Sequence, residues 1–465
     1  MQSPVNIVLL AAGLGTRMKS KMAKVLHRAG GMALVEHAAR TALEITSPER
    51  IVVVVGHQSD KVRAALAGYG VRFAEQREQK GTGHALLCAR EELASHDGML
   101  LTLYGDCPLL EAATLRKLIE AQQGTARAAT LITTCLDDPT GYGRILHDAG
   151  GDIAAIVEQK AATPEQLAIR EVNSGIYCFR SDLLWKHIGE IRPDNPAQEY
   201  YLTDLVEIYR RAGHAVGTLK VADPGELLGI NTRIELAQVD AIFRERKLRE
   251  LMLAGVTIEK PETVTIDGDV RIGRDSIVEP FARILGKTVI GEDCRVGACS
   301  IVVDSTLGDR VELGPFSIVG TSRVDSDAHI GPYARLRMEN HVEAGGSVGN
   351  FVELKKTRLG AGAKAMHLAY LGDTSIGADV NIGAGTITCN YDGAQKHRTT
   401  IHDGAFVGSN STLVAPLEIG AGSYIGAGSV VTKPVPADSL AVARSHQVVK
   451  EDWAKRRREK LKCGQ

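Results

Sequence analysis

A glycine-rich turn that ends in a cation stands near the start of the sequence. The stretch Leu9-Leu10-Ala11-Ala12-Gly13-Leu14-Gly15-Thr16-Arg17-Met18 leaves an apolar run, and Lys24 follows it. Glycines let the backbone approach phosphate oxygens closely, and the exposed N–H groups can form an anion cradle. Two cations beside such a turn suit a polyphosphate. The turn is neither a Walker loop nor a GxGxxG fingerprint, so by itself it is also explained by an ordinary strand–loop corner.

A second group of polar side chains lies between residues 352 and 392. It interrupts an otherwise regular pattern and contains Glu353, Lys355, Lys356, His367, Tyr370, Asn381, Thr388, Cys389, Asn390, Tyr391 and Asp392. Residues 393–398 (GAQKHR) break the spacing and predict an ejected loop, which in a solenoid commonly lies on the binding face. An imidazole titrates near working pH and suits a general base, although a lone histidine in a repeat is more often structural.

Two kinds of pattern must position these residues. Up to about residue 230, apolar runs at 6–10, 51–55 and 99–104 alternate with helical stretches such as 83–93 and 113–121. This alternation predicts a parallel sheet covered by helices on both faces, with ligands bound at the carboxyl ends of its strands. The loops after Leu10 and Tyr104 are therefore the expected sites. Residues 232–254 then predict a charged connecting helix.

After Gly255 the period changes to six. The aliphatic residues expected to point inward are Ile272, Val278, Ile284, Ile290, Val296, Val302, Leu307, Leu313, Val319, Val324, Ile330, Leu336, Val342, Val348, Leu354, Leu359, Leu371, Ile376, Ile382, Ile401, Val407, Leu413, Ile419, Ile425 and Val431. A solenoid of triangular coils has this period, whereas a helix or an antiparallel strand does not. Glycines often follow the aliphatic residue (Gly291, Gly297, Gly426), and we expect these corners to need unusual φ angles.

The glycine-rich turn resembles the LAAGxGTRM signature of sugar-1-phosphate nucleotidyltransferases. Further matches follow in order: Gln76 with Gly81-Thr82-Gly83-His84, Tyr104-Gly105-Asp106, Gly141-Tyr142-Gly143-Arg144, Ile156-Val157-Glu158, Asn173-Ser174-Gly175, Tyr200-Tyr201-Leu202-Thr203-Asp204 and Gly229-Ile230-Asn231-Thr232-Arg233. With the six-residue repeat, the chain resembles the bifunctional bacterial enzymes that combine N-acetylglucosamine-1-phosphate uridyltransferase with glucosamine-1-phosphate acetyltransferase.

The resemblance implies an α/β Rossmann-like nucleotidyltransferase domain and an all-β left-handed parallel β-helix. We expect a uridyltransferase domain over 1–231, a linker helix over 232–255, an acetyltransferase β-helix over 256–440 and a tail over 441–465. The implied enzyme acetylates glucosamine-1-phosphate from acetyl-CoA. It then transfers uridylyl from UTP to the product, releasing pyrophosphate and making UDP-N-acetylglucosamine for peptidoglycan and lipopolysaccharide. A homotrimer joined through the β-helix is also implied.

For uridylyl transfer, the resemblance implies three sets of residues. The uridine and its phosphates would be held by Leu10, Ala11, Gly13, Gln76, Gly81 and Thr82, while Lys24, Tyr104, Gly105, Asp106 and Asn231 would also bind UDP-N-acetylglucosamine. The N-acetylglucosamine would be held by Gly143, Glu158, Asn173 and Thr203. Mg²⁺ would be bound by Asp106 and Asn231, while Arg17 and Lys24 would stabilise the departing pyrophosphate. Alone, Asp106 before Pro108 would more commonly be a helix N-cap, but the series of matches favours the metal.

For acetyl transfer, the resemblance implies His367 as the general base, with Glu353 orienting it. The sugar phosphate would be bound by Arg337, Lys355, Tyr370, Asn381 and Lys396. Acetyl-CoA would be contacted by Asn390, Tyr391, Ser409, Ala427 and Arg444. We interpret Cys389 as a bystander. Three residues depart from the family pattern: Ala23 and Met366 stand where proline and glycine are usual, and Met338 replaces a common proline.

Composition limits the alternatives. The net charge of -1 argues against a nucleic-acid or membrane-surface partner, and the apolar stretch near the N-terminus is too short for a membrane span. The eight cysteines form no CxxC pair, which favours a reducing, cytoplasmic location without zinc or disulfides. Two rival functions remain: a single-activity nucleotidyltransferase with a scaffold β-helix, and a catalytically silent regulatory subunit. The basic tail, 450–462, predicts a solvated helix.

Overall fold

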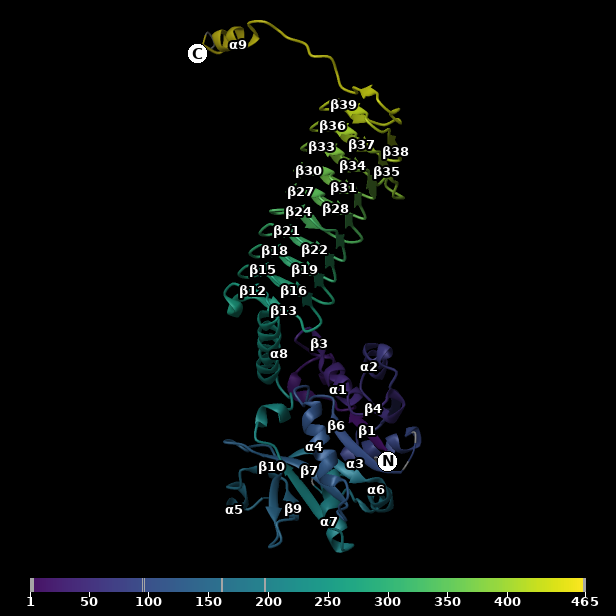
Figure 1. Ribbon diagram of the computed structural model, residues 1–465, viewed down its shortest axis with the longest axis vertical. Helices are drawn as coiled ribbons and strands as arrows, with labels where there is room; N and C mark the ends of the chain where they lie inside the picture. The colour runs from purple at the N-terminus through teal and green to yellow at the C-terminus, as the bar shows by residue number, and fades with distance from the viewer. Residues whose placement is uncertain (1–3, 94, 96, 160–161, 196–197, 463–465) are drawn as a thin grey trace. The chain divides into compact units, whose positions relative to one another are not determined.

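The computed structural model describes residues 4–93, 95, 97–159, 162–195 and 198–462 (Figure 1). Cys463, one of the eight cysteines considered above, lies outside the described residues. The chain divides into two compact units, Met1–Phe243 and Arg244–Gln465. None of the helices in the described ranges has both the length and the apolar character needed to cross a bilayer.

The first unit is built on a nine-stranded mixed sheet, whose main path runs β11-β7-β10-β6-β1-β4-β5. Its strands are β1 (Val5–Leu10), β4 (Ile51–Val55), β5 (Arg72–Glu75), β6 (Met99–Tyr104), β7 (Ala129–Cys135), β8 (Arg144–His147), β9 (Ile153–Val157), β10 (Glu171–Arg180) and β11 (Val216–Lys220). β1 pairs in parallel with both β4 and β6, as predicted. The sheet is not all parallel, because β10 runs antiparallel between β6 and β7, and β8 and β9 form a hairpin attached to β10.

Helices cover both faces of this sheet. They are α1 (Leu34–Leu43), α2 (Ser59–Ala65), α3 (Thr82–Ala89), α4 (Ala112–Gln122), α5 (Pro164–Leu167), α6 (Ser181–His187) and α7 (Leu205–Arg211), and a small hairpin of β2 (Arg28–Ala29) and β3 (Met32–Ala33) precedes α1. Successive strand residues belong to different cores: Val8 and Leu10 pack in one, Ile7 and Leu9 in the other. A strand buried on both sides must be apolar throughout, which explains the continuous apolar runs.

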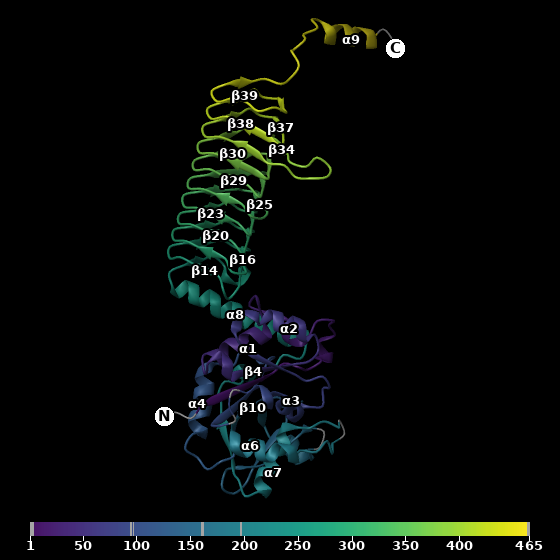
Figure 2. The same ribbon diagram turned by 90° about the vertical axis from the view of Figure 1, so that its right-hand side faces the viewer.

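The second unit is the predicted left-handed parallel β-helix, with three faces of stacked short strands (Figure 2). The first face contains β12 (Thr257–Ile258), β15 (Ile277–Val278), β18 (Arg295–Val296), β21 (Glu312–Leu313), β24 (His329–Ile330), β27 (Ser347–Asn350), β30 (Lys364–His367), β33 (Asn381–Ile382), β36 (Phe406–Val407), β39 (Tyr424–Ile425) and β41 (Leu440–Ala441).

The other two faces complete each coil. The second face contains β13 (Thr265–Ile266), β16 (Arg283–Leu285), β19 (Ile301–Val303), β22 (Ile318–Gly320), β25 (Arg335–Leu336), β28 (Glu353–Lys355), β31 (Tyr370–Gly372), β34 (Ile387–Cys389), β37 (Thr412–Val414) and β40 (Val430–Val431). The third face contains β14 (Arg271–Ile272), β17 (Val289–Ile290), β20 (Thr306–Leu307), β23 (Arg323–Val324), β26 (His341–Val342), β29 (Arg358–Leu359), β32 (Thr374–Ile376), β35 (Thr399–Ile401) and β38 (Leu417–Ile419).

The interior of the prism is filled by the aliphatic residues that the period of six predicted. All of them belong to a single buried cluster. At two positions the period of six places a residue that is not a large aliphatic one, and both residues are also buried in the interior: Ala365 fully, and Thr388 with 1% exposed. Thr388 is tolerated there because its hydroxyl accepts a hydrogen bond from Gly372 N at 2.8 Å, so no polar group is left unpaired.

The predicted reason for the glycines after the aliphatic residues is wrong. Gly291, Gly297 and Gly426 are not among the residues with positive φ, which fall later in each corner, as at Asp293. The constraint at Gly291 and Gly297 is space between coils instead. A Cβ at Gly291 would lie 2.7 Å from Gly308 C, and a Cβ at Gly297 would lie 2.5 Å from Pro315 N. Glycine therefore permits the close backbone approach of neighbouring coils.

Two further helices complete the chain. α8 (Arg233–Leu253) begins in the first unit and ends in the second. Its N-terminus has a capping box, because Thr232 Oγ1 accepts from Glu235 N at 3.3 Å while Glu235 Oε2 accepts from Thr232 N at 2.7 Å. α9 (Trp453–Lys462) lies in the basic tail, and all its residues are exposed.

Candidate active sites

A cavity of about 430 Å³ opens where β1 and β6 end, at residues Leu10 and Tyr104, which are register partners. Of the residues predicted to bind UDP-N-acetylglucosamine, it is lined by Leu10, Ala11, Gly13, Lys24, Gln76, Gly81, Thr82, Tyr104 and Asp106. The prediction missed other lining residues, among them Gln79 and Glu199. Gly105 stands beside the lining and donates its N–H to Leu10 O at 3.0 Å.

The glycine-rich turn wraps closely around Lys24. Gly15 has a φ of +62°, and a Cβ there would lie 2.6 Å from Lys24 Cβ. A side chain at this position would be both strained and in collision with the lysine, so glycine is required. The turn then forms a short 3-10 helix, Thr16–Met18, whose Met18 is buried and whose Arg17 is exposed.

Lys24 connects the predicted metal ligands. Its ammonium forms a short ion pair with Asp106 and donates to Asn231 Oδ1 at 3.3 Å. Arg17 donates to the same Asn231 oxygen at 2.8 Å. Lys24 and Asp106 side chains are each 15% exposed, so this charge pair is sheltered but open to the cavity. Four residues from three distant parts of the sequence thus meet at one point.

The N-terminus of α8 holds Asn231 in place. Glu235, which the sequence analysis did not single out, accepts from Asn231 N at 2.6 Å and from Thr232 N at 2.7 Å. A carboxylate on the first free N–H groups of a helix is favourable because it also meets the positive end of the helix dipole. The Thr-x-x-Glu spacing in the sequence could have identified Glu235.

The far wall of the cavity is held by Gln76. This side chain is 4% exposed, and its Nε2 donates to Gly81 O at 3.1 Å and lies 3.0 Å from His84 Nδ1. Both amide hydrogens are therefore used inside the wall, which leaves Oε1 as the remaining polar atom. Thr82 Oγ1 accepts from Leu202 N at 3.1 Å and ties the start of α3 to the segment after Tyr201.

The residues predicted to hold the sugar lie outside the lining of this cavity, and three of them, Gly143, Glu158 and Asn173, lie beside one another. Asn173 N donates to Gly143 O at 2.9 Å, and a Cβ at Gly143 would lie 3.4 Å from Glu158 Oε1. Thr203 stands in a 3-10 helix, Leu202–Asp204. Burial raises the pKa of Glu158. Burial, followed by the charges of Glu207 and Glu158, raises the pKa of Asp204 to about 6.

Ala23 shows how this chain manages without the usual proline before the lysine. Its φ of -55° is one that proline adopts, but its N–H is used: it donates to Gln58 Oε1 at 3.1 Å. Gln58 also donates to Lys21 O at 2.6 Å. The loop is therefore fixed by a side-chain hydrogen bond from a distant residue rather than by a pyrrolidine ring.

On the β-helix, the second face carries an ionic cluster. Arg337 Nη1 donates to Glu353 Oε1 at 3.1 Å, and Arg335 Nη1 lies 3.8 Å from Glu353 Oε2. Tyr370 is the register partner of Glu353 on the next coil. Parallel stacking puts these side chains side by side on the outside of one sheet.

A second cluster lies where β28, β31 and β34 end, at the edge between the second and third faces. Lys355 Nζ lies 3.9 Å from Asp373 Oδ2, and Asn390 forms a short hydrogen bond to the same carboxylate. The adjacent Lys355 ammonium lowers the pKa of Lys396. Two ammonium groups held together in this way form a site for an anion such as a phosphate.

The loop between β34 and β35 brings Lys396 to this cluster. Figure 2 shows this loop standing out from the stack of coils. Asp392 holds the loop together by accepting from Gln395 N at 2.7 Å and lying 2.7 Å from His397 Nε2. These hydrogen bonds lower the pKa of Asp392. Tyr391, which begins the loop, is 60% exposed and pairs across it with Lys396.

His367 lies at the edge between the first and second faces. It is exposed, and its Nδ1 is 3.0 Å from Asn350 Oδ1. Glu353, which the resemblance implied would orient His367, is instead engaged with Arg337 and Arg335. Asn350 was not singled out by the sequence analysis, although its place one coil before His367 was available from the repeat.

The remaining predicted residues lie on or beside the first face rather than the second. Asn381 begins β33, Ser409 follows β36 and Ala427 follows β39. Gly428 N donates to Ser409 O at 2.8 Å, so Ser409 and Ala427 are on adjacent coils. Arg444 lies just beyond, its Cδ 3.9 Å from the Cβ position of Gly428. The predicted acetyl-transfer residues are therefore divided between two faces that meet at a convex edge.

The seven cysteines within the described ranges are free thiols. Those ranges contain no group of three or more His, Cys, Asp or Glu side chains that could hold a metal ion.

Comparison with known proteins agrees with this architecture. Residues 7–163 match the MobA-like NTP transferase domain, and residues 269–303 and 398–433 match the bacterial transferase hexapeptide repeat. The chain is 63% identical over 99% of both chains to "Bifunctional protein GlmU" of Solibacter usitatus, and 49% identical over 98% of both chains to that of Koribacter versatilis. It belongs to the GlmU family. The GlmU of Trichlorobacter lovleyi is 47% identical over 97% of this chain and 98% of that protein.

Membership of the GlmU family decides between the functions considered above. The prediction of a bifunctional enzyme of UDP-N-acetylglucosamine synthesis is confirmed, with uridyltransferase and glucosamine-1-phosphate acetyltransferase activities in one chain. The substrates are therefore a nucleoside triphosphate, acetyl-CoA and a small sugar phosphate. The single-activity reading with a scaffold β-helix is the weaker alternative.

The raised pKa of Asp204 predicts a pH-dependent stability. Because the folded-state pKa of about 6 exceeds the ordinary 3.8, this group favours the folded state below pH 3.8, and the contribution is lost as pH rises through 6. Asp204→Asn should therefore stabilise the protein at pH 7.5 by about 1 kcal/mol, a value reduced for partial exposure, and by nothing near pH 4. Calorimetry of the full chain at both pH values would measure this, and an equal effect at both would contradict it.

The hydrogen bond at Ala23 predicts a non-additive pair of substitutions. Ala23→Pro should change the free energy of unfolding by less than about 0.5 kcal/mol, because the lost hydrogen bond is offset by a stiffer unfolded chain. Gln58→Asn keeps a residue that tolerates positive φ, but the asparagine side chain is too short to reach Ala23 N. This substitution should lower the free energy of unfolding by about 1 kcal/mol. Urea unfolding of the double variant should show less than the sum of the two losses. Strict additivity would mean that Ala23 and Gln58 are not coupled.

Proposed function

We propose that the cavity beside Lys24 is the uridylyl-transfer site. The observation that carries this proposal is the meeting of Lys24, Asp106, Asn231 and Arg17 at the mouth of a glycine-rich turn. In-line attack of a sugar phosphate on the α-phosphorus of UTP needs positioning and charge neutralisation more than a covalent protein group. On nucleotide binding, Lys24 would exchange its carboxylate partner for phosphate oxygens, and the exposed Arg17 would meet the leaving pyrophosphate.

We propose further that Asp106 and Asn231 hold Mg²⁺. A carboxylate oxygen and an amide oxygen both lie beside the Lys24 ammonium, so the two side chains already favour positive charge at that point. Mg²⁺ takes one or two such oxygen ligands and completes its shell with water and substrate phosphates. When bound, the ion would neutralise charge developing on the phosphates. Glu235 fixes the backbone of Asn231 for this role.

For the sugar, we propose the group formed by Gly143, Glu158, Asn173 and Thr203. Burial raises the pKa of the Glu158 carboxyl and raises that of Asp204 in the same region. Carboxyl groups of this kind accept hydrogen bonds from neutral hydroxyls. Uncharged sugar hydroxyls are therefore better matched to this group of residues than phosphates are, which leaves the phosphates to the cations Lys24 and Arg17.

On the β-helix, we propose that His367 Nε2 takes the proton from the amino group of glucosamine-1-phosphate as the amine attacks the acetyl thioester. The exposed imidazole is accessible to substrate. As the C–S bond breaks, CoA leaves as a thiolate, which takes up the proton held by His367 and is released as the thiol. Lys355, Lys396 and Arg337 supply cations for the sugar phosphate, and the Tyr370 hydroxyl can donate to the thioester oxygen as charge develops there. Cys389 has no part in this direct transfer.

We propose that the acetyl-transfer site is completed by other copies of the chain in a homotrimer. Asn381, Ser409, Ala427 and Arg444 belong to the first face and its flank, whereas Lys355 and its neighbours belong to the second. One convex prism cannot enclose a substrate with both sets. Three prisms around an axis, each with its first–second edge inward, would set the first face of one copy against the second face of the next.

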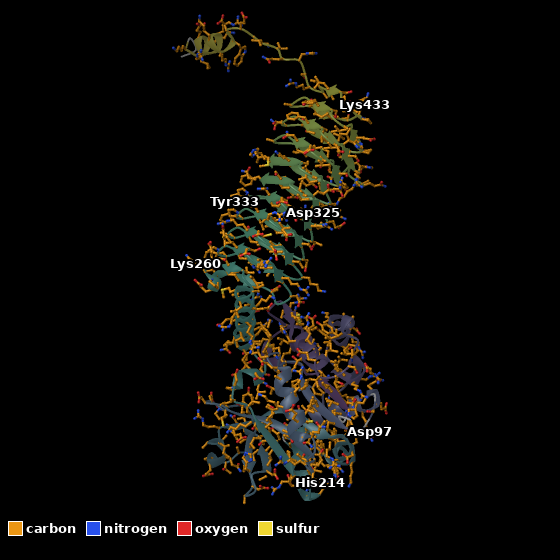
Figure 3. The ribbon with its side chains drawn as sticks, viewed as in Figure 1. Asp97, His214, Lys260, Asp325, Tyr333 and Lys433 are labelled. Atoms are coloured by element: carbon orange, nitrogen blue, oxygen red, sulfur yellow. The ribbon has the colours of Figure 1, made fainter. Side chains whose placement is uncertain are left out.

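The edge between these two faces has the composition of an interface. Five residues, here called the aromatic edge, occupy the same corner of different coils and are 47–63% exposed: Phe281, Phe316, Tyr333, Phe351 and Leu368. All five have positive φ, which is unfavourable for bulky residues. Phe316, Tyr333 and Phe351 stack with ring centroids 5.1 and 5.3 Å apart. Figure 3 shows Tyr333 at the outer edge of the β-helix. Exposed aromatic side chains with positive φ do not stabilise a single copy of the β-helix, which supports the burial of these side chains between copies.

A cytoplasmic location is part of the same proposal. It is supported by the free thiols of the described ranges, which suit a reducing compartment.

The two activities can be separated in one experiment. Purified protein would be given glucosamine-1-phosphate, acetyl-CoA, UTP and Mg²⁺, with thiol and pyrophosphate followed separately. His367→Ala should lose thiol release by about 10²-fold or more, as expected for removal of a general base, yet still release pyrophosphate from supplied N-acetylglucosamine-1-phosphate. Lys24→Ala should do the reverse. Pyrophosphate release without any thiol release by the unmodified protein would favour the single-activity reading.

The proposed trimer predicts that disrupting the aromatic edge abolishes acetyl transfer but not uridylyl transfer. Phe316→Asp with Tyr333→Asp should give a monomer by light scattering, lose thiol release and keep uridylyl transfer. Val289→Asp is the matched control, since Val289 is 39% exposed on the third face, which the proposal leaves outside the interface. A trimer that survives the double substitution, or a monomer that still acetylates, would refute this arrangement.

A further inference from the structure

We propose that Asn350 is the positioning residue of the acetyl-transfer base and that it fixes His367 with Nε2 free to accept a proton. This inference rests on the proposed role of His367. It gives to a neutral amide a task for which the sequence suggested the carboxylate of Glu353. The observation behind it is the 3.0 Å contact between Asn350 Oδ1 and His367 Nδ1.

The backbone of this coil is built to make that contact. Elsewhere on the first face the strands have two residues, but β27 and β30 have four each, and their pairing extends to Asn350 and His367 as register partners. Leu368 N also donates to Asn350 O at 3.1 Å. The extension requires Gly349, because a Cβ there would lie 2.0 Å from Met366 O. Glycine brings the two strands close enough for their last side chains to lie in parallel.

The contact decides which ring nitrogen is free. The Oδ1 atom of an amide can only accept, so His367 Nδ1 must donate to it and carry a hydrogen. In the neutral imidazole the other nitrogen, Nε2, then has its lone pair available. The ring is held in one orientation at an exposed edge, with its basic nitrogen directed away from Asn350. A ring free to rotate would present the wrong tautomer for part of the time.

The charge of the partner also matters. The strands packed on β30 present Ser347 and Asn350 from β27 and Asn381 from β33, and β30 itself carries Lys364. Tyr370 follows the corner on β31, and Glu353 on β28 is paired with Arg337. The nearest partner of the imidazole is thus neutral. A carboxylate in place of Asn350 would stabilise the protonated ring, which cannot act as a base.

Two substitutions separate orientation from charge. Asn350→Ala removes the acceptor, so kcat for thiol release should fall by about tenfold or more, with little change in KM for glucosamine-1-phosphate. Asn350→Asp keeps an acceptor of the same shape, so kcat at high pH should be close to that of the unmodified protein. The acid limb of its pH profile should move by about one unit toward higher pH.

The controls use the same chain. Uridylyl transfer from supplied N-acetylglucosamine-1-phosphate and the oligomeric state should be unchanged in each variant, which establishes folding. Ser347→Asp adds a carboxylate to the same strand without reaching Nδ1, and should leave the acid limb in place. An Asn350→Ala variant with unreduced kcat, or an Asn350→Asp profile that coincides with that of Ser347→Asp, would overturn the inference. If His367→Ala itself kept thiol release, the proposed role of His367 would fail instead.

Discussion

Parallel backbone hydrogen bonds between successive coils are the constraint on which the β-helix depends. They place residues about one coil apart in sequence beside each other, as Glu353 lies beside Tyr370 and Asn350 beside His367. The aliphatic interior fixes the register of every coil, because a slip of one residue would turn its buried side chains outward. Each polar group on the outside is therefore positioned by the whole stack, without a dedicated supporting loop. The exception is the loop with Lys396, which needs its own hydrogen bonds at Asp392.

The first unit achieves the same precision differently. Its strands deliver Leu10 and Tyr104 to one edge of the sheet, but Lys24 and Asn231 come from segments that follow no repeat. These are fixed individually: Lys24 by the tight turn at Gly15, and Asn231 by Glu235 at the start of α8. The result is a cluster of opposite charges that satisfy one another; in the function that we propose, a polyphosphate would compete for the lysine. Its charges remain close to neutral overall, which lowers the cost of sheltering them.

Features that burial dictates could be predicted from the sequence, whereas features that depend on contacts between distant segments could not. The period of six correctly predicted the inward residues of the prism, because burial acts on every turn of a repeat. The apolar runs correctly predicted β4 and β6, because strands buried on both faces are apolar throughout. The antiparallel insertion of β10 was not visible, because the direction of a strand in a sheet depends on its connections and pairing, which the composition of Glu171–Arg180 does not reveal. Gly291 was assigned to the wrong cause because a sequence does not distinguish a requirement for positive φ from a close approach. Lys24 was singled out as a cation close to the glycine-rich turn, but its contact with Asp106 required the fold.

The side-chain contacts of Lys24 and Arg17 differ from the contact between Asn350 and His367 in a way that fits the chemistry proposed for each site. Uridylyl transfer develops negative charge on phosphates, so permanent cations are useful there, and Lys24 and Arg17 are held by oxygens that a phosphate can replace. Acetyl transfer needs a group that is neutral before the reaction and charged after it. An ionic partner would favour the charged form too early, whereas the amide of Asn350 can orient His367 without adding a charge. Placing Glu353 with Arg337 keeps its carboxylate engaged by a guanidinium, so that the ring of His367, the base that we propose, has a neutral neighbour.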